Sequence, residues 1–296
     1  MPTYHILYNP LAGDGTGATK AETLKEVFTD GEPSFHDITK LDINKFIAES
    51  GADDKIVISG GDGTLSRFVN TIYDNLPDKE IYYHAAGSGN DFAKDIALKK
   101  NEVTLLNPYL KKLPVTYVKG EKYRFINGVG FGIDGYCCDE GEKLRAKGKS
   151  INYTAIAIKG VLFFYNTTNA TITVDGVTKT YKNVWMIPTM FGRYYGGGMM
   201  ACPLQSRANE DGSVSVMVVR SKSRFKLLTV LPRIFGGTHI KVKSVVETLT
   251  GHEVTVTFDR PTALQIDGET IRDVLSYTVK SEKALKAEEE EKCLAE

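Results

Sequence analysis

The 296-residue chain has no excess of charge of either sign, no patterned cysteines and no long hydrophobic run. Its 37 basic and 37 acidic side chains balance, so the bulk electrostatics give no indication of a nucleic-acid partner. The four cysteines form no metal knuckle, CxxC motif or disulfide framework, which predicts reduced thiols in a reducing compartment.

The sequence also shows no signal peptide and no membrane-spanning segment. Residues 1–5 lack the basic stretch and the apolar run of a secretory signal. The most apolar segment, residues 155–165, is too short and too interrupted to cross a bilayer. We therefore expect a cytoplasmic protein whose contact with a membrane, if any, is peripheral.

The composition is that of an ordinary globular protein, 42% hydrophobic and 25% charged, over a length that suits two domains. The first hundred residues alternate short apolar runs, at 4–8, 55–59 and 81–85, with amphipathic stretches such as 16–28. Strand, turn and helix repeated in this way predict an α/β domain with a parallel sheet.

From about residue 113 the chain becomes a succession of β-rich runs separated by turns. The expected elements are a helix over 224–235 and strands over 124–129, 170–174, 184–188, 213–219, 254–258, 263–266 and 276–279. The sequence thus predicts an α/β domain over residues 1–112 and a β-rich domain over 113–280. The acidic tail, 281–296, is expected to be an exposed segment that can fold back on the first domain.

The turn Gly60-Gly61-Asp62-Gly63-Thr64 joins an apolar strand to an amphipathic helix. Glycines let the backbone approach a ligand closely, and amides at a helix N-terminus favour anions. Asp62 would repel a phosphate unless it served a metal ion or a hydrogen bond, so its presence indicates a function. We interpret this turn as a phosphate-binding loop rather than a simple connection.

Two more turns repeat this pattern. Gly87-Ser88-Gly89-Asn90-Asp91 follows the next strand, and Asn9-Pro10-Leu11-Ala12-Gly13 follows the first. Since the carboxyl ends of parallel strands meet at one edge of a sheet, the three turns together predict a nucleotide site. Residues 130–135 also fit GxGxxG, but no acidic residue follows about twenty positions later, so we do not interpret them as a dinucleotide site.

Two turns in the second half of the chain carry carboxylates. Gln265-Ile266-Asp267-Gly268-Glu269 places two of them around a glycine, which suits a general base but, from the pattern alone, suits an ordinary hairpin better. Ala208-Asn209-Glu210-Asp211-Gly212-Ser213 offers a carboxylate beside exposed carbonyls, which are donors that a hard cation such as Mg2+ prefers.

In this order, the motifs resemble the diacylglycerol kinase catalytic-domain family, in its bacterial soluble lipid-kinase branch. The resemblance rests on Asn9-Pro10 with Gly13, on residues 60–64 and 87–93, and on Asp267-Gly268-Glu269, and it spans nearly the whole chain. It implies an α/β domain related to NAD kinases, with helices on both faces of its sheet, and a C-terminal β-sandwich domain. It also implies an active site in the cleft between the domains.

The resemblance further implies roles for individual residues. Glu269 matches the proposed proton acceptor, with Asp267 beside it as a second catalytic residue, which reverses the hairpin interpretation. A structural Mg2+ site is implied at the side chain of Asp211 and the carbonyls of Ala208 and Ser213. The implied nucleotide contacts are Asn9, Pro10, Gly13, Thr39, Gly60, Gly61, Asp62, Gly63, Thr64, Gly87, Ser88, Gly89, Asn90 and Asp91.

The chain departs from the family pattern at three places. Ser66-Arg67 stands where Asn-Glu is usual, and Ser88 replaces a common threonine. Residues 113–120 contain no acidic residue, whereas many members have one in the corresponding segment. These departures concern the substrate and the activity more than the fold.

The activity that the resemblance implies is transfer of the γ-phosphate of ATP, with Mg2+, to the hydroxyl of diacylglycerol or a related lipid. Two alternatives remain open, namely a kinase acting on a sphingoid base or NAD, and a non-catalytic nucleotide- or lipid-binding protein. The expected partner is a lipid substrate met transiently at a membrane surface, without nucleic acid, and a homodimer is left open.

Overall fold

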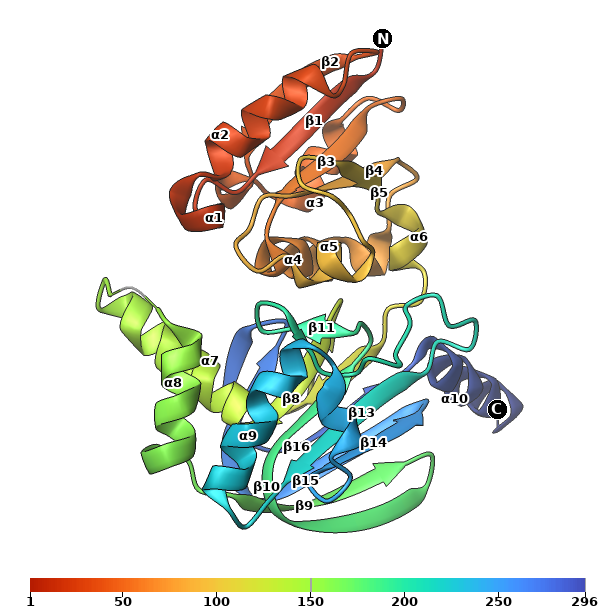
Figure 1. Cartoon of the computed structure of the whole chain (residues 1–296). Coiled ribbons are helices and arrows are strands. Elements are labelled where there is room, and N and C mark those ends of the chain that lie inside the picture. Colours follow the sequence, from red (N-terminus) through yellow and green to blue (C-terminus); the bar gives the residue numbers. More distant parts are fainter. Residues whose placement is uncertain (150, 296) are drawn as a thin grey trace. The chain divides into compact units, whose positions relative to one another are not determined.

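The computed structural model describes residues 1–149 and 151–295 (Figure 1). The chain divides into two compact units, Met1–Lys111 and Lys112–Glu296. The division lies beside residue 112, where the sequence changes from alternating strands and helices to successive strands.

The first unit is an α/β domain. Its elements are β1 (Thr3–Tyr8), α1 (Ala12–Gly15), α2 (Gly17–Glu22), β2 (Glu32–Asp37), α3 (Ile43–Glu49), β3 (Lys55–Gly60), α4 (Asp62–Ile72), β4 (Ile81–Ala85), α5 (Asp91–Asp95), β5 (Val103–Leu105) and α6 (Asn107–Leu110). The strand order is β2-β1-β3-β4-β5. All neighbours pair in parallel except β4 and β5, so the predicted parallel sheet is confirmed and ends in an antiparallel edge strand that the sequence pattern did not predict.

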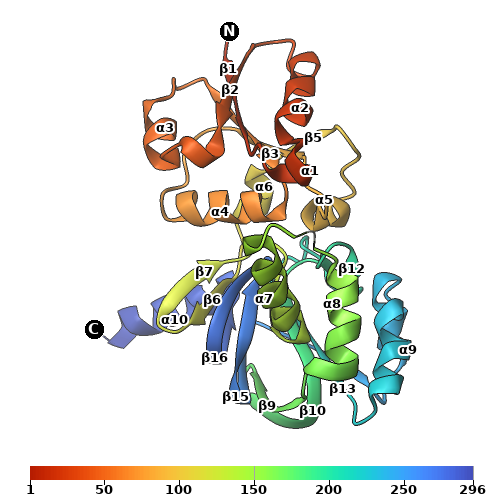
Figure 2. The same cartoon turned by 90° about the vertical axis from the view of Figure 1, so that its left-hand side faces the viewer.

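Helices cover both faces of this sheet (Figure 2). Tyr4 and Ile6 of β1 pack in one buried cluster with Ala21 of α2. Successive side chains of a strand point to opposite faces, and His5 accordingly meets the ring of Phe46 from α3 at 5.2 Å. The alternating pattern of β1 therefore gives each face its own helical layer.

The register of the sheet brings the ends of its strands together. Tyr8 of β1 pairs with Asp37 of β2 and with Ser59 of β3, and Gly60 of β3 pairs with Ala85 of β4. Each of these residues lies at or next to the carboxyl end of its strand. The turns that follow β1, β3 and β4 therefore leave the same edge of the sheet.

The second unit is β-rich, as the sequence predicted. Its strands are β6 (Val115–Val118), β7 (Glu121–Arg124), β8 (Gly128–Gly132), β9 (Thr168–Val174), β10 (Val177–Met190), β11 (Tyr194–Tyr195), β12 (Met199–Met200), β13 (Val214–Arg220), β14 (Val246–Gly251), β15 (Glu253–Ile266) and β16 (Glu269–Lys280). Among the described residues, hydrogen bonds join nine of these strands into one sheet, and β11 and β12 form a separate pair.

Two long strands, β10 and β15, organise this sheet. The first part of each pairs with β9, and the last part of each pairs with β8. Strands β8 and β9 thus lie end to end between β10 and β15. The predicted strands 254–258 and 263–266 are both parts of β15, whereas residues 125–127, expected to be part of a strand, connect β7 to β8.

The helices of this unit are α7 (Ile133–Ala146), α8 (Tyr153–Lys159), the π-helical segment η4 (Gly160–Phe164), α9 (Arg224–Phe235) and α10 (Glu282–Ala295). Helix α9 has the bounds that the sequence predicted, whereas α7 and α8 were not expected. Buried side chains of α7, η4 and α9, among them Ile133, Val161 and Leu227, share one core cluster with Trp185 of β10.

The acidic tail forms α10, which belongs to the second unit. The amide of Ser281 donates to the carbonyl of His252 at 2.8 Å, and Lys280 pairs with Glu288 at 2.8 Å. The tail thus packs beside β16, and the expectation that it can fold back on the first domain stays a prediction. Within the described part of the chain, no helix is both long and apolar enough to cross a bilayer.

Candidate functional site

In chain order, the three glycine turns of the first unit are residues 9–13, 60–64 and 87–91. The second and third of these turns touch each other. A Cβ atom built on Gly87 would lie 2.4 Å from the Cα of Gly61, and one built on Gly61 would lie 3.0 Å from the Cα of Gly87. Real Cβ atoms do not tolerate the shorter distance, so position 87 requires glycine. The sequence predicted close approach of a ligand to these turns, and the structure adds a close approach between the turns themselves.

Asp62 holds these two turns together. Its Oδ2 accepts a hydrogen bond from the amide of Asp91 at 2.9 Å, and its Oδ1 accepts one from the amide of Phe92 at 2.9 Å. These are amides of the first turn of α5, where a negative charge is favoured. The sequence analysis expected Asp62 to serve a metal ion or a hydrogen bond. The structure shows that it accepts hydrogen bonds from the protein's own backbone. A contact of Asp62 with nucleotide or metal stays a prediction.

The first turn is tied to the second by Asn9. Its Nδ2 donates to Thr64 Oγ1 at 2.8 Å, and its Oδ1 accepts the amide of Leu11 at 3.0 Å. Gly13 in the same turn has a φ of +58°, and a Cβ there would lie 2.5 Å from the carbonyl oxygen of Ala86. The structure therefore brings Asn9, Gly13, residues 60–64 and residues 87–91 into one constellation, as the sequence predicted.

Lys20 is a residue of this constellation that the sequence interpretation missed. Its Nζ donates to the carbonyl of Ala86 at 2.9 Å and lies 2.3 Å from where a Cβ of Gly13 would be. This places a half-buried positive charge beside the first and third turns, where a phosphate would be stabilised by it. A lysine one helical turn into α2, seven positions after a glycine, was too weak a signal to identify it.

Asn90, in the third turn, has a buried side-chain oxygen that accepts no hydrogen bond from the described residues. The residue has a left-handed φ of +50°, which asparagine tolerates, and its Nδ2 donates to the carbonyl of Gly87 at 2.8 Å. Its buried Oδ1 has no hydrogen-bond partner among the described residues. A buried acceptor of this kind is costly unless a bound group satisfies it. Ser88, in the same turn, lies 3.4 Å from Asp14.

Thr39 lies beyond the carboxyl end of β2, at the same edge of the sheet. Its amide and its hydroxyl donate to Asp37 Oδ1 at 3.0 and 2.6 Å, and these bonds lower the pKa of Asp37. Among the described residues, Thr39 forms no hydrogen bond with the glycine turns, so its role as a nucleotide contact stays a prediction. At the departure from the family pattern, Ser66 is buried in α4 and Arg67 is exposed.

In the second unit, Asp267 holds the segment that leads into β8. Its Oδ2 accepts the amide of Ile126 at 2.7 Å, and its Oδ1 accepts those of Asn127 and Gly128 at 2.8 and 3.0 Å. The residue itself has a φ of +47° in the β15–β16 turn. Glu269, two residues on, is exposed. The geometry thus gives Asp267 a positioning role, while its catalytic role and that of Glu269 stay predictions.

The predicted metal loop is tied to the same segment. Arg207 donates to the carbonyl of Ile126 and, at 2.6 Å, to Asn127 Oδ1. Asp211 Oδ1 accepts the amide of Ser213 at 3.1 Å, which is the main reason why the pKa of Asp211 is lowered. A charged carboxylate beside carbonyl oxygens suits Mg2+, although the carbonyl of Ser213 already accepts Gln205 Nε2 at 2.8 Å.

A buried carboxyl group, that of Asp134, lies close to the turn at residues 265–269. The sequence analysis did not identify it as a candidate site residue. Asp134, in the first turn of α7, is 7% exposed, and neither of its carboxyl oxygens has a hydrogen-bond partner among the described residues. A Cβ on Gly130 would lie 1.8 Å from its Oδ2 and 2.8 Å from Gln265 Nε2. The glycine pattern at 130–135, set aside as a dinucleotide motif, therefore makes room for this acid.

Burial raises the pKa of Asp134 to about 7. The buried Nε2 of Gln265 also lacks a partner in the described part of the chain, while its Oε1 accepts the amide of Gly268 at 2.8 Å. The turn that carries Glu269 is therefore backed by a polar, incompletely satisfied interior.

Comparison with known families agrees with this geometry. Residues 3–117 match the diacylglycerol kinase catalytic domain, and residues 127–282 match the YegS C-terminal NAD kinase beta sandwich-like domain. The chain belongs to the family of bacterial lipid and diacylglycerol kinases that join these two domains. The resemblance inferred from the sequence motifs is thereby confirmed.

Similar proteins include two named diacylglycerol kinase. The one from Mycobacterium tuberculosis is 24% identical over 65% of this chain and 63% of its own length, so less than two thirds of that relative is spanned. The one from Bacillus subtilis is 23% identical over 91% of this chain and 90% of its length. A crystal structure of a diacylglycerol kinase from Bacillus anthracis superimposes with a TM-score of 0.65 at 20% identity, covering 95% of this chain and 93% of that one, which shows the shared fold.

Replacing Gly87 by alanine is expected to separate the second and third turns, because the new Cβ would overlap the Cα of Gly61. A misplacement of about 1 Å in a positioning loop weakens function by roughly a hundredfold. Isothermal titration with ATP and Mg2+ would measure the loss of affinity. Gly236→Ala is the matched control, since nothing lies within 4 Å of its Cβ position. Equal affinities for the two variants would contradict the close contact.

Replacing Asp62 by alanine is expected to destabilise the first unit by about 2–3 kcal/mol, because two amides of α5 lose a charged acceptor. Asp62→Asn keeps one acceptor oxygen and should lose about half as much. Denaturant unfolding gives both values. An Asp62→Ala variant as stable as the wild type would show that α5 does not depend on this carboxylate.

Replacing Asp134 by asparagine is expected to stabilise the protein increasingly as the pH rises. The carboxyl group ionises near pH 4 in the unfolded chain but only near pH 7 in the folded one. Between these values the unfolded state binds fewer protons, so the stability of the wild type falls as the pH rises. The asparagine variant escapes this loss, which reaches at most about 4 kcal/mol above pH 7. Urea unfolding at pH 5 and pH 8 measures it, and a gain independent of pH would refute it.

Proposed function

We propose that this protein is an ATP-dependent lipid kinase that transfers the γ-phosphate to a hydroxyl of diacylglycerol or a related lipid. The observation that carries the proposal is the constellation of three glycine turns at one edge of the parallel sheet. Asp62 and Asn9 hold these turns in contact, and Gly61 and Gly87 leave no side chain between them.

The first unit supplies what a nucleoside triphosphate needs. Backbone amides of glycine turns and of the start of α4 offer donors to phosphate oxygens. Lys20 adds a positive charge beside Gly13, and the unsatisfied Oδ1 of Asn90 is an acceptor for a bound group. These residues fit ATP in chemistry and in the space that the glycines leave.

Mg2+ fits the oxygen donors of both units. Asp91 and Asp62 are the carboxylates of the nucleotide constellation, and Asp211 with the carbonyls of Ala208 and Ser213 forms the loop that the family resemblance implies as a structural site. When bound, the ion would neutralise charge on the phosphates. The described residues contain no cluster of three or more His, Cys, Asp or Glu side chains, so these sites would depend on backbone carbonyls and on the nucleotide itself.

Proton removal from the acceptor hydroxyl is assigned to Glu269. Its side chain is exposed, and the attachment of Asp267 to three backbone amides fixes the turn that presents it. A lipid acceptor, rather than NAD, is supported by the family of the chain and by the names of its relatives.

The test is transfer of radiolabelled phosphate from ATP to a panel of lipids, with the products identified by mass spectrometry. Glu269→Gln is expected to lower kcat by about 10²–10⁴-fold, which is the usual contribution of a general base, with unfolding free energy unchanged to within about 0.5 kcal/mol. Wild-type turnover in this variant would remove Glu269 from the proposed role.

Asp267→Asn separates positioning from proton transfer. It removes the charge that holds the amides of residues 126–128 and is expected to cost about 1–3 kcal/mol of stability.

ATP binding without transfer to any lipid, sphingoid base or NAD would support a non-catalytic binding protein in place of the kinase.

A further inference from the structure

The second unit exposes three phenylalanines at one end. Phe163 and Phe164 are the last two residues of η4 and are 72% and 64% exposed. Phe225, in the first turn of α9, is 78% exposed. The rings of Phe163 and Phe164 lie 6.2 Å apart. Neighbouring aromatic side chains that remain in water at this level mark a binding surface.

These phenylalanines are held on one rigid surface. Arg224, next to Phe225, donates to the carbonyl of Val161 and, at 3.1 Å, to the carbonyl of Tyr165. It thereby fixes the start of α9 to both ends of the segment that carries Phe163 and Phe164. In Figures 1 and 2, α8 and α9 lie side by side in this unit. The buried side chains of Val161 and Leu227 anchor the two segments in the core.

The segments that form this surface carry charge of one sign, although the whole chain is neutral. Residues 143–174 and 212–246 contain no aspartate or glutamate. They do contain twelve basic residues, namely Lys143, Arg145, Lys147, Lys149, Lys159, Arg220, Lys222, Arg224, Lys226, Arg233, Lys241 and Lys243. Helices α8 and α9 and the segment η4 therefore present phenylalanines and cations without a single acidic side chain.

A basic pocket adjoins the start of α9. It has a volume of about 230 Å3 and is lined by Lys182, Asn183, Arg220, Ser221, Lys222 and Ser244. The nearby acid Glu247 is shared between Lys179 at 3.0 Å and Arg220 at 4.0 Å. No described residue forms an ion pair with Lys182 or Lys222. Two lysines, serine hydroxyls and no acidic lining residue suit a phosphate group.

We propose that the surface formed by Phe163, Phe164 and Phe225 with this basic pocket docks the protein on an anionic lipid bilayer. The phenylalanines enter the boundary between headgroups and acyl chains, and the cations meet lipid phosphates, which is how interfacial segments bind membranes. Ile158, 43% exposed at the end of α8, extends the apolar part. The choice of a bilayer as the occupant rests on the proposed lipid acceptor.

The experiment is sedimentation of the full chain with phosphatidylcholine vesicles, with and without phosphatidylglycerol. Binding is expected to be stronger with the anionic lipid and to weaken as salt is added. Phe163→Ala combined with Phe164→Ala should lower the partition coefficient at least about tenfold on both kinds of vesicle. Lys222→Glu should lower it roughly fivefold, on anionic vesicles only.

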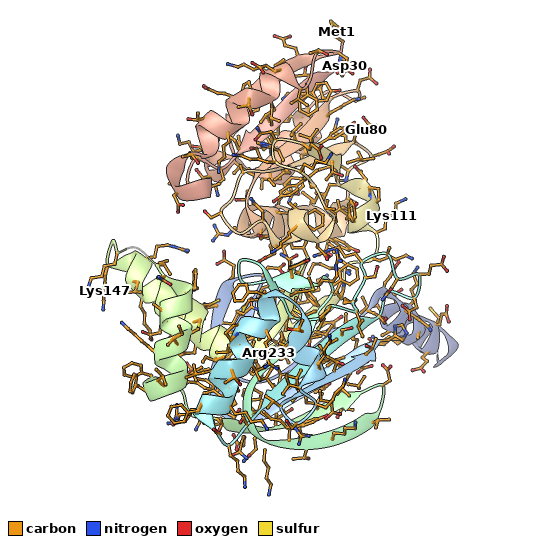
Figure 3. All side chains as sticks on the ribbon, viewed as in Figure 1. Met1, Asp30, Glu80, Lys111, Lys147 and Arg233 are labelled. Carbon is orange, nitrogen blue, oxygen red and sulfur yellow. The ribbon has the colours of Figure 1, made fainter. Side chains whose placement is uncertain are left out.

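The same helix offers matched controls. Phe235, 50% exposed, and Arg233 lie in the last turn of α9, away from η4 (Figure 3 labels Arg233). Phe235→Ala is expected to bind vesicles as the wild type does, and Arg233→Glu is expected to lose less binding to anionic vesicles than Lys222→Glu, because Arg233 does not line the basic pocket. Thermal melts of every variant separate loss of binding from loss of folding, and all five side chains are at the surface, where substitutions change stability little.

Two outcomes would overturn the docking surface. One is vesicle binding that the phenylalanine pair and Lys222→Glu leave unchanged, and the other is equal loss in the control variants. Binding to a single-stranded RNA more tightly than to anionic vesicles would also replace the bilayer by a nucleic acid. Phosphorylation of detergent-dispersed lipid, measured in parallel, tests the proposed function separately. If no detergent-dispersed lipid is phosphorylated, the proposed kinase function is wrong, and the comparison of vesicle binding still tests the docking surface.

Discussion

The structure depends on carboxylates that accept backbone amides. Asp62 binds the first two amides of α5 and so fixes the second glycine turn against the third. Asp267 binds three successive amides that lead into β8 and so fixes the turn that presents Glu269. Each carboxylate meets donors that would otherwise lie unsatisfied at the start of an element. Turns rich in glycine have little side-chain packing to hold them, so these charged hydrogen bonds are what gives the loops a single geometry.

Each unit places its functional groups on a framework that packing makes rigid. In the first, the parallel register aligns the carboxyl ends of β1, β3 and β4, and helices on both faces bury the sheet. In the second, β15 and β16 deliver the turn at residues 267–269, and Arg207 ties the loop of Asp211 to the same segment that Asp267 holds. The incomplete hydrogen bonding of Asp134 and Gln265 beneath that turn is a cost in stability accepted at a candidate site.

Much of this could be predicted from local patterns, and the failures have physical causes. Apolar runs followed by glycine turns identified β3 and β4, and the helix predicted over 224–235 matches α9, whose start the structure shows to be capped by Ser223. Helix α7 was missed because its first turn lies within the glycine pattern at residues 130–135, and glycine disfavours a helix. Lys20 and Arg207 were missed because each bonds residues far away in sequence, where no spacing rule applies, and Asp134 was missed because its burial depends on the folded core.

The sequence by itself determined the family, the α/β and β-rich halves and the turns that carry glycine and carboxylate, because these follow from periodicity and from motifs of a few residues. Only the tertiary structure decided what those residues do. It showed that Asp62 and Asp267 bind amides and that Gly61 and Gly87 meet backbone to backbone. The reason is that hydrogen bonds and steric exclusion depend on distances between segments that lie far apart in the chain, and only folding sets those distances.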